Sequence, residues 1–256
     1  MEAVIYICHG SRVEQAKHES MQLLRRVKDQ VDAPIQKGCF LELQEPNISD
    51  AVAKVVEQGA TKIVVMPILL LTAGHAKRDI PKLIEQEHHK YPEVEFVYGK
   101  AIEVDDRMVD VLAERIDELP LQNLEHFEML LVGRGSSDPD ILTDMDQLAN
   151  MLQERYPNSS LEVCFLAAAK PKFEQLLQAK VNQSSSVIVI PYLLFTGLLD
   201  RGIKEYIASL NLGNDQQVLR TDYLGHHPNV VDVLVDRTKE AMEGAADRAE
   251  MAEGSS

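Results

Sequence analysis

The sequence predicts an α/β protein of two similar lobes, each a four-stranded parallel sheet flanked by helices. Short β-branched runs alternate with longer amphipathic stretches along the chain, and such alternation is typical of a parallel sheet with helices on both faces. The first half of the chain also returns in the second half. This self-similarity indicates an internal duplication.

Three pairs of segments carry the duplication. They are VIYICHGSR (4–12) with MLLVGRGSS (129–137), CFLELQEPNI (39–48) with CFLAAAKPKF (164–173), and IVVMPILLLTAGHAKRDI (63–80) with VIVIPYLLFTGLLDRGIK (187–204). The first two pairs are offset by 125 residues and the third by 124, which one deleted residue explains. This spacing predicts an N-terminal lobe over residues 1–120, a linker over 121–128 and a diverged C-terminal lobe over 129–243.

The first half contains four strand-like runs, each followed by a helical pattern. β-branched residues dominate the short runs, and the longer stretches place apolar residues at helical spacing. The predicted strands are residues 3–8, 35–41, 63–67 and 94–98. The predicted helices lie near residues 13–30, 49–58, 78–89 and 105–119. Pro120 and the polar residues 122–126 then mark the linker.

The second half repeats this plan. Its predicted strands are residues 129–133, 161–166, 187–191 and 218–222. Asp138 followed by Pro139 predicts the start of the fifth helix, because aspartate is a favoured N-cap and proline suits the first helical position. Residues 244–256 are small and acidic without an apolar period, so we expect a frayed, disordered tail.

Composition and charge exclude several classes of function. The 256-residue chain is 45% hydrophobic and has a net charge of −15. No apolar run reaches the length of about 18 residues that a membrane span needs, so a soluble, cytoplasmic protein is expected. The negative charge argues against nucleic acid and anionic membranes as partners. Cys8, Cys39 and Cys164 lie in apolar runs without a CxxC pair, which predicts buried free thiols in a reducing compartment.

Three positions differ between the halves in a way that matters for metal binding. His9, Glu42 and His75 each follow one of the first three predicted strands, and ligands of open parallel sheets bind beyond the carboxyl ends of the strands. Taken singly, each is more often an ordinary loop residue. Together, two imidazoles and a carboxylate suit Fe(II), Co(II), Ni(II) or Zn(II) with coordination positions left open. The matching residues in the second half are Arg134, Ala167 and Leu199.

Basic and hydroxyl residues lie near the same strand ends. Gly10-Ser11 and Gly135-Ser136 each precede a predicted helix, whose first amides can hold an anion such as a carboxylate. The candidate substrate-binding residues are Ser11, Arg12, Lys77, Arg78, Arg134 and Ser136, with Arg201 as a further candidate. The alternative is a set of ordinary solvated residues beside loops. Residues 133–138, GRGSSD, lack the third glycine of a dinucleotide-binding turn, which argues against nucleotide binding.

Five motifs resemble the sirohydrochlorin chelatases in their long, two-lobed form. They are HGSR (9–12), FLELQEP (40–46), PILLLTAGHAKRDIP (67–81), GRGSSDPD (133–140) and PYLLFTG (191–197). The resemblance is greatest to the sirohydrochlorin ferrochelatases of siroheme biosynthesis. It implies an ATP-independent lyase that inserts Fe2+ into sirohydrochlorin, with no cofactor beyond the divalent metal substrate. It also implies that His9 and His75 are the catalytic, metal-handling pair and that Glu42 completes the site.

The metal and the class of activity leave alternatives open. Long relatives devoted to cobalt insertion can carry a histidine-rich stretch and a cysteine pair near the C-terminus, and this chain ends in AADRAEMAEGSS without either. Iron is therefore favoured, with Co2+ or Ni2+ as further accepted metals. The alternatives are a sirohydrochlorin cobaltochelatase of cobalamin biosynthesis, a non-catalytic metallochaperone and a tetrapyrrole carrier. Relatives with one lobe pair as dimers, so a monomer or weak homodimer is expected here.

Overall fold

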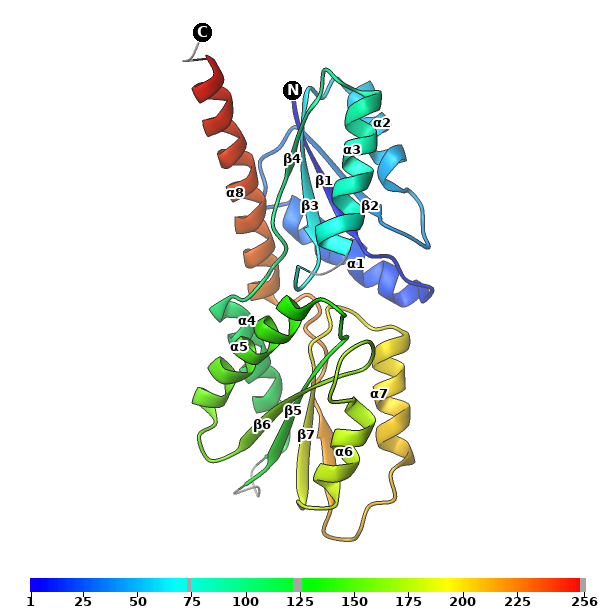
Figure 1. Cartoon of the computed structure of the whole chain (residues 1–256), viewed down its shortest axis with the longest axis vertical. Coiled ribbons are helices and arrows are strands. Elements are labelled where there is room, and N and C mark those ends of the chain that lie inside the picture. Colours follow the sequence, from blue (N-terminus) through cyan, green and yellow to red (C-terminus); the bar gives the residue numbers. More distant parts are fainter. Residues whose placement is uncertain (73–74, 122–125, 254–256) are drawn as a thin grey trace. The chain divides into compact units, whose positions relative to one another are not determined.

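A computed structural model shows two α/β units built from two copies of one motif (Figure 1). The structure describes residues 1–72, 75–121 and 126–253, apart from the side chains of residues 75, 76 and 245–253. One unit consists of residues 1–103 together with 231–256, and the other of residues 104–230. Each unit contains one parallel sheet of four strands, which confirms the predicted fold class.

The first sequence repeat alternates strands and helices as expected. Its elements are β1 (Glu2–Cys8), α1 (Glu14–Lys28), β2 (Ile35–Phe40), α2 (Ile48–Glu57), β3 (Lys62–Ile68), the π-helical turn η1 (His75–Asp79), α3 (Ile80–Lys90), β4 (Glu95–Tyr98) and α4 (Asp106–Asp117). The strand order is β2-β1-β3-β4. Cys8 lies opposite both Phe40 and Ile68, so β1, β2 and β3 end at one edge of the sheet. We call this edge, with the loops that follow it, the first rim.

The second repeat has the same plan. Its elements are β5 (Glu128–Gly133), α5 (Pro139–Arg155), β6 (Ser160–Phe165), α6 (Phe173–Val181), β7 (Ser186–Pro191), α7 (Leu198–Ser209), β8 (Gln217–Arg220) and α8 (Pro228–Glu253). The strand order is β6-β5-β7-β8. The predicted cap of the fifth helix is confirmed, because the Asp138 side chain accepts a hydrogen bond from the Asp140 amide at 3.2 Å. The loops after β5, β6 and β7 form the second rim.

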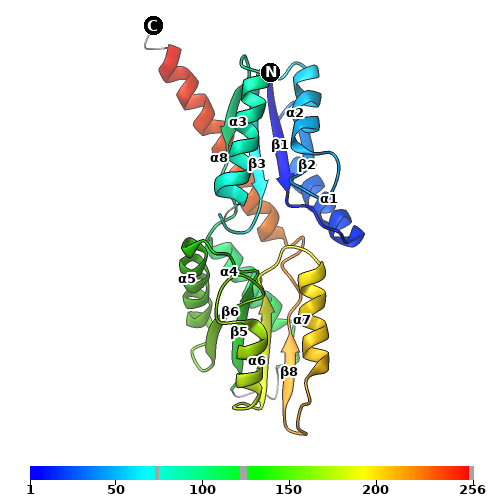
Figure 2. The ribbon, with the colours of Figure 1, turned by 45° about the vertical axis from the view of Figure 1, so that its right-hand side comes forward.

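Helices cover both faces of each sheet, which explains why the central strands are almost wholly apolar. In the first unit α2 and α3 lie on one face, and α1 and α8 lie on the other (Figure 2). Alternate residues of β1, such as Ile5 and Ile7, pack with Val52 and Val55 of α2. Tyr6 points to the opposite face, where its hydroxyl donates to Gln36 at 2.8 Å.

The packed units do not coincide with the sequence repeats. Helix α4 closes the first repeat in sequence but belongs to the second unit, where it packs on α5. Helix α8 closes the second repeat, yet its residues from Val231 onward belong to the first unit. The predicted lobes, 1–120 and 129–243, therefore describe the duplication in sequence, whereas in the structure each repeat gives its last helix to the other unit. An apolar helix face fixes that a helix is buried but not which sheet buries it.

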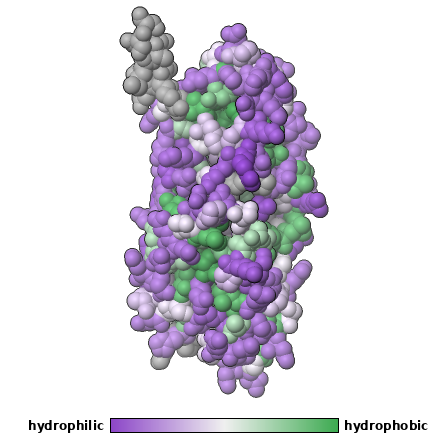
Figure 3. Space-filling view, in the orientation of Figure 1, coloured by the Kyte–Doolittle hydropathy of each residue, from purple (hydrophilic) through white to green (hydrophobic). Residues whose placement is uncertain are grey.

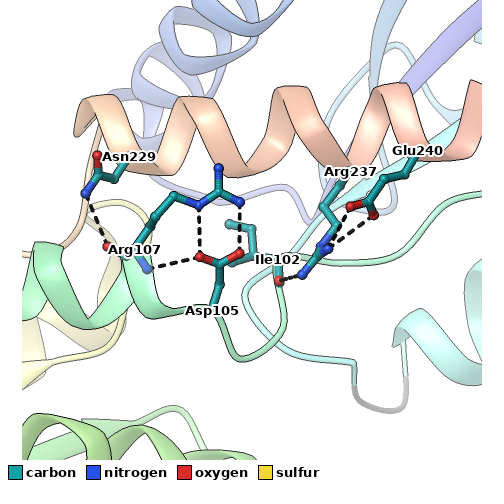
Figure 4. Close-up of polar contacts among 6 residues, drawn as sticks. All are labelled: Ile102, Asp105, Arg107, Asn229, Arg237 and Glu240. Carbon is teal, nitrogen blue, oxygen red and sulfur yellow. Dashed lines mark hydrogen bonds and ion pairs between the residues drawn. The ribbon is translucent and has the colours of Figure 1, made fainter.

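Two equivalent arginines hold these exchanged helices. In the second unit the Arg115 guanidinium on α4 donates to the Leu224 carbonyl at 3.5 Å. In the first unit the Arg237 guanidinium on α8 donates to the Ile102 carbonyl at 3.3 Å and to Glu240 at 3.1 Å (Figure 4). Donors and acceptors are both offset by 122 residues between the repeats, so the exchange is reciprocal.

Helix α8 takes in most of the C-terminal segment that the sequence analysis treats as a tail. Helix α8 continues to Glu253, and residues 254–256 lie outside the described part of the chain. Alanine, glutamate, methionine and arginine fill most of residues 245–253, and these are strong helix formers. Local propensity therefore continues the helix even without an apolar period. Residues 122–125 of the predicted linker also lie outside the described residues.

The remaining chain-wide expectations concern thiols and the surface. Cys8, Cys39 and Cys164 are buried free thiols, as predicted, and burial raises the pKa of Cys8 and of Cys164 to about 12. Hydrophilic residues cover most of the face seen in Figure 3. Within the described ranges, no helix combines the length and the apolarity that crossing a membrane requires.

A glycine stands two residues after the first strand of each repeat for a steric reason. Gly10 has φ of +95° and Gly135 has φ of +88°, a region that side-chain-bearing residues rarely adopt. A Cβ added to Gly10 would lie 1.9 Å from the Glu42 carbonyl oxygen, and one added to Gly135 would lie 2.0 Å from that of Ala167. Each glycine therefore lets the chain leave its strand in close contact with the neighbouring rim loop.

Gly135→Ala should destabilise the fold far more than a matched glycine substitution. Gly59 has the same φ of +88°, and an added Cβ there would meet no atom within 4 Å. Gly59→Ala should therefore lower the free energy of unfolding by only about 1 kcal/mol, the cost of a left-handed backbone for alanine. Gly135→Ala should lower it by about 1–3 kcal/mol more, because the added methyl group overpacks the contact with Ala167. Urea unfolding of both variants measures the difference. Equal losses would contradict the steric role of Gly135.

Candidate metal and substrate site

The first rim brings the backbones of His9 and Glu42 together. Pairing between β1 and β2 continues past the strands, because the Leu41 amide donates to the Cys8 carbonyl at 2.8 Å. The Glu42 amide then donates to the His9 carbonyl at 3.2 Å. With the Gly10 backbone pressed against the Glu42 carbonyl, the two candidate ligands start from fixed and neighbouring positions.

The His9 and Glu42 side chains also meet. His9 Nδ1 lies 3.4 Å from Glu42 Oε1, and the two side chains are 27% and 48% exposed. Two donors about 2.1 Å from one metal ion, at angles of about 90–110°, would lie about 3.0–3.4 Å apart. The observed separation therefore suits two ligands of one ion. Their partial exposure leaves the pair accessible to an incoming metal.

His75 stands at the first residue of η1, directly after the β3 loop, but its side chain lies outside the described part of the structure. Among the side chains that are described, no group of three or more His, Cys, Asp or Glu residues is placed to hold a metal ion. The structure thus brings two of the three predicted ligands, His9 and Glu42, together.

The candidate substrate-binding residues occupy both rims. Ser11 and exposed Arg12 follow β1, and exposed Lys77 and Arg78 lie on η1 after β3. In the second unit, Arg134 and Ser136 follow β5, and Arg201 is exposed on α7.

The two serines play the same local role in the two repeats. Ser11 Oγ accepts a hydrogen bond from the Val13 amide at 3.1 Å, and Ser136 Oγ accepts one from the Asp138 amide at 3.1 Å. Each serine thereby shapes the turn that leads into a helix. A hydroxyl that accepts one hydrogen bond still has its own hydrogen to donate, so this turn role is compatible with contact to an anion.

The second rim keeps the backbone arrangement without the ligands. The Ala167 amide donates to the Arg134 carbonyl at 2.8 Å, matching the bond between Glu42 and His9. Neither Ala167 nor Leu199 has a side chain that binds metal. The two halves therefore share the backbone arrangement of the rim and differ in the side chains that it carries.

Sequence reasoning missed a buried carboxylate beside Leu199. Asp200 is fully buried, and its carboxylate pairs with Arg220 and with Lys204 Nζ at 2.9 Å. It also accepts a hydrogen bond from the Thr196 hydroxyl at 3.3 Å. Ala76 is the counterpart of Asp200 in the aligned repeats. This difference between aspartate and alanine is the feature of the sequence that could have pointed to Asp200. It marks a loop that the second repeat holds by ion pairs among its own residues.

Comparison with known proteins agrees with this duplicated frame. The family model described as CbiX matches the chain twice, over residues 3–119 and 128–241. The chain is 43% identical to the sirohydrochlorin ferrochelatase of Priestia megaterium, over 93% of this chain and 90% of that protein. It is 32% identical to the sirohydrochlorin cobaltochelatase of the same organism, over 95% of this chain and 81% of that protein.

A solved structure shares both the sequence and the fold. SirB from Bacillus subtilis with Fe3+ superposes with a TM-score of 0.83 at 38% identity, covering 94% of this chain and 95% of that one. The family model and the relatives span both repeats, including the segments that carry His9, Glu42 and His75. The chain therefore belongs to the CbiX family.

Proposed function

We propose that this protein is a sirohydrochlorin ferrochelatase, a lyase that inserts Fe2+ into sirohydrochlorin and releases two protons to give siroheme. The observation that carries the proposal is the 43% identity to a ferrochelatase over 93% of the chain. The His9–Glu42 pair supports it, because the two donor atoms stand at a separation suited to one ion. Metal ion and tetrapyrrole are both substrates in this reaction.

His9, Glu42 and His75 are the proposed metal-handling residues. Insertion requires the ring to lose two pyrrole protons while the ion enters, so a base that titrates near neutral pH has to lie beside the metal. Imidazole, with an ordinary pKa of about 6.5, suits that task. We assign metal delivery and proton acceptance to His9 and His75 together. Glu42 supplies the charge-balancing oxygen.

The basic residues of the rims are proposed to bind the peripheral carboxylates of the ring. Arg12, Lys77 and Arg78 are exposed in the first unit, and Ser11 stands beside Arg12. Arg134 and Ser136 hold the corresponding place after β5 in the second repeat. Charge-assisted hydrogen bonds from the groups of the first rim would orient an anionic ring with its centre toward the metal.

A cobaltochelatase is the second candidate function. A 32% identical relative is a sirohydrochlorin cobaltochelatase, and a SirB structure at 37% identity is described in complex with cobalt. A nitrogen and oxygen site generally binds Co2+ more tightly than Fe2+, so cobalt is expected to enter the site in vitro. Iron stays the preferred assignment, because the identity to ferrochelatases reaches 43% and 38%.

Anaerobic absorbance spectra of the protein with sirohydrochlorin, with and without Fe2+, test the proposed function. A chelatase should convert many rings per protein molecule when Fe2+ is present. A tetrapyrrole carrier would shift the ring spectrum without converting it, and a metallochaperone would bind the ion without affecting the ring. The same assay with Co2+ compares the two chelatase candidates through kcat/KM.

His9→Ala and His75→Ala should each lower chelation by about 100-fold or more, because each change removes both a metal ligand and a base. Glu42→Ala should lower it less, since water can replace one oxygen ligand. His18→Ala is a matched control, because His18 is exposed on α1. Steady-state rates measure the effect, and circular dichroism checks the fold. Near-normal turnover in folded His9 and His75 variants would rule out the assignment.

One high-affinity site for Fe2+ or Co2+ should be found per chain. Arg134, Ala167 and Leu199 supply no ligand set in the second repeat, so only the first rim should hold the ion. Anaerobic titration followed by absorbance or calorimetry gives the stoichiometry. Loss of this site in Glu42→Ala or His9→Ala would assign it to the first rim, whereas two equivalent sites per chain would contradict the proposed divergence.

Sirohydrochlorin should be preferred to protoporphyrin on the order of a hundredfold in kcat/KM at low salt. Sirohydrochlorin carries several times as many carboxylates as protoporphyrin. Each exposed ion pair between a basic side chain and a carboxylate contributes about 0–1 kcal/mol of binding free energy, so three or four additional pairs account for the preference. It should shrink as salt screens the charges.

Charge-removing variants locate the source of this preference. Arg12→Gln and Lys77→Gln should reduce it, whereas Lys54→Gln, on the exposed surface of α2, should leave it unchanged. A preference that does not respond to salt would mean that ring shape selects the substrate.

A further inference from the structure

Glu103 occupies a backbone conformation that ordinarily belongs to glycine. Its φ is +62°, and the residue in the same place of the second repeat is Gly225, also with φ of +62°. Matched backbone hydrogen bonds establish the equivalence. In the first repeat the Glu103 amide donates to the Leu70 carbonyl at 2.8 Å and the Ile102 amide to that of Leu69 at 3.0 Å. In the second repeat the Gly225 amide donates to the Leu194 carbonyl at 2.8 Å and the Leu224 amide to that of Leu193 at 2.9 Å. A side chain at this position carries a backbone cost that glycine avoids.

The Glu103 side chain has a specific contact that offsets this cost. The Thr72 hydroxyl donates to Glu103 Oε1 at 3.0 Å, and both residues belong to the first unit. Thr72 lies after β3 and three residues before His75. The carboxylate therefore holds the start of the segment that leads to His75. Strained conformations of this kind gather at functional sites.

The second repeat keeps the threonine but gives it a different partner. Thr196, the counterpart of Thr72, donates to Asp200 at 3.3 Å, so that loop is closed on its own next helix. Gly225 has no side chain to take part. In the first repeat Ala76 stands in the place of Asp200, and the carboxylate comes instead from Glu103, the last residue before the chain enters the second unit. The change of partner accompanies the change from Leu199 to His75.

Placing the carboxylate at Glu103 has a chemical consequence. An acid at position 76 would stand directly beside His75 and would pair with the cations of the loop, as Asp200 pairs with Lys204. Glu103 instead accepts a hydrogen bond from the equivalent threonine, Thr72, which lies 31 residues away in the sequence. Thr72 is thereby held without a carboxylate inserted next to the proposed metal-handling imidazole.

We propose that Glu103 is a positioning residue, which acts on His75 by holding Thr72, three residues before it in the sequence. The inference rests on the proposed function, because it takes His75 to handle the metal. Glu103 contacts neither metal nor ring in this assignment. Its carboxylate reduces the number of conformations open to Thr72, so that less order has to be imposed when the ion binds.

Glu103→Gly in the full-length protein tests the proposal. Glycine accepts φ of +62° without a backbone penalty, so the variant should unfold at the same or a higher urea concentration. Its affinity for Co2+, titrated anaerobically, and its kcat for chelation should each fall about 10–100-fold, the usual effect of losing a partner behind a metal ligand. A fold defect would instead lower the unfolding midpoint along with activity.

Three further variants separate positioning from other roles. Glu103→Gln keeps an oxygen that accepts the Thr72 hydroxyl, so it should bind Co2+ within about threefold of the unmodified protein. Thr72→Val should reproduce the loss seen in Glu103→Gly, and the double variant should be no weaker than either single one. Thr196→Val, the matched change in the second repeat, should leave Co2+ affinity unchanged.

The outcomes distinguish this inference from the proposed function. If His75→Ala abolishes chelation while Glu103→Gly does not lower it, the positioning role is wrong and the metal assignment stands. If Glu103→Gln is as weak as Glu103→Gly, or if the Thr72 and Glu103 losses add, the charge acts directly and the positioning role is overturned. If His75→Ala itself chelates normally, the proposed site is wrong and Glu103 loses its assigned role with it.

Discussion

The close approach of the Gly10 backbone to the Glu42 carbonyl is the constraint on which the first rim depends. Parallel pairing carries β1 and β2 to the same edge, and Gly10 lets the chain leave β1 without a side chain between the two loops. The His9 and Glu42 backbones are then joined by a hydrogen bond, and their side chains meet at 3.4 Å. A larger residue at position 10 would separate the pair, whatever the chemistry of its two members.

Duplication kept this constraint and changed the side chains placed on it. Gly135 stands as close to Ala167 as Gly10 does to Glu42, so both rims have one backbone design. In the second unit the loop after β7 is held internally by buried Asp200 and its cationic partners. In the first unit Thr72, the counterpart of Thr196, donates instead to Glu103. Under the proposed function, the first rim handles the metal.

The exchange of helices makes each unit depend on both repeats. Helix α4 contributes a buried apolar face to the second unit, and α8 contributes one to the first. Arg115 and Arg237 each reach a carbonyl that belongs to the other repeat in sequence but to the same packed unit. Neither sheet is fully covered by the helices of its own repeat. Because burial of apolar surface is the main driving force of folding, each unit needs the last helix of the other repeat to fold.

The sequence by itself determined the alternation of strands and helices, the two parallel sheets, the placement of His9 and Glu42 after adjacent strands, and the absence of their counterparts from the second half. These features follow from local periodicity and from self-comparison, which need no knowledge of partners. Only the tertiary structure decided which sheet buries α4 and α8, that Thr72 pairs with Glu103 rather than with a neighbour in its own loop, and that Asp200 is buried among cations. Hydrophobic periodicity specifies that a face is buried but not what covers it. A hydrogen bond between residues 31 positions apart depends on how the chain packs, so the pattern of residues along it cannot reveal that bond.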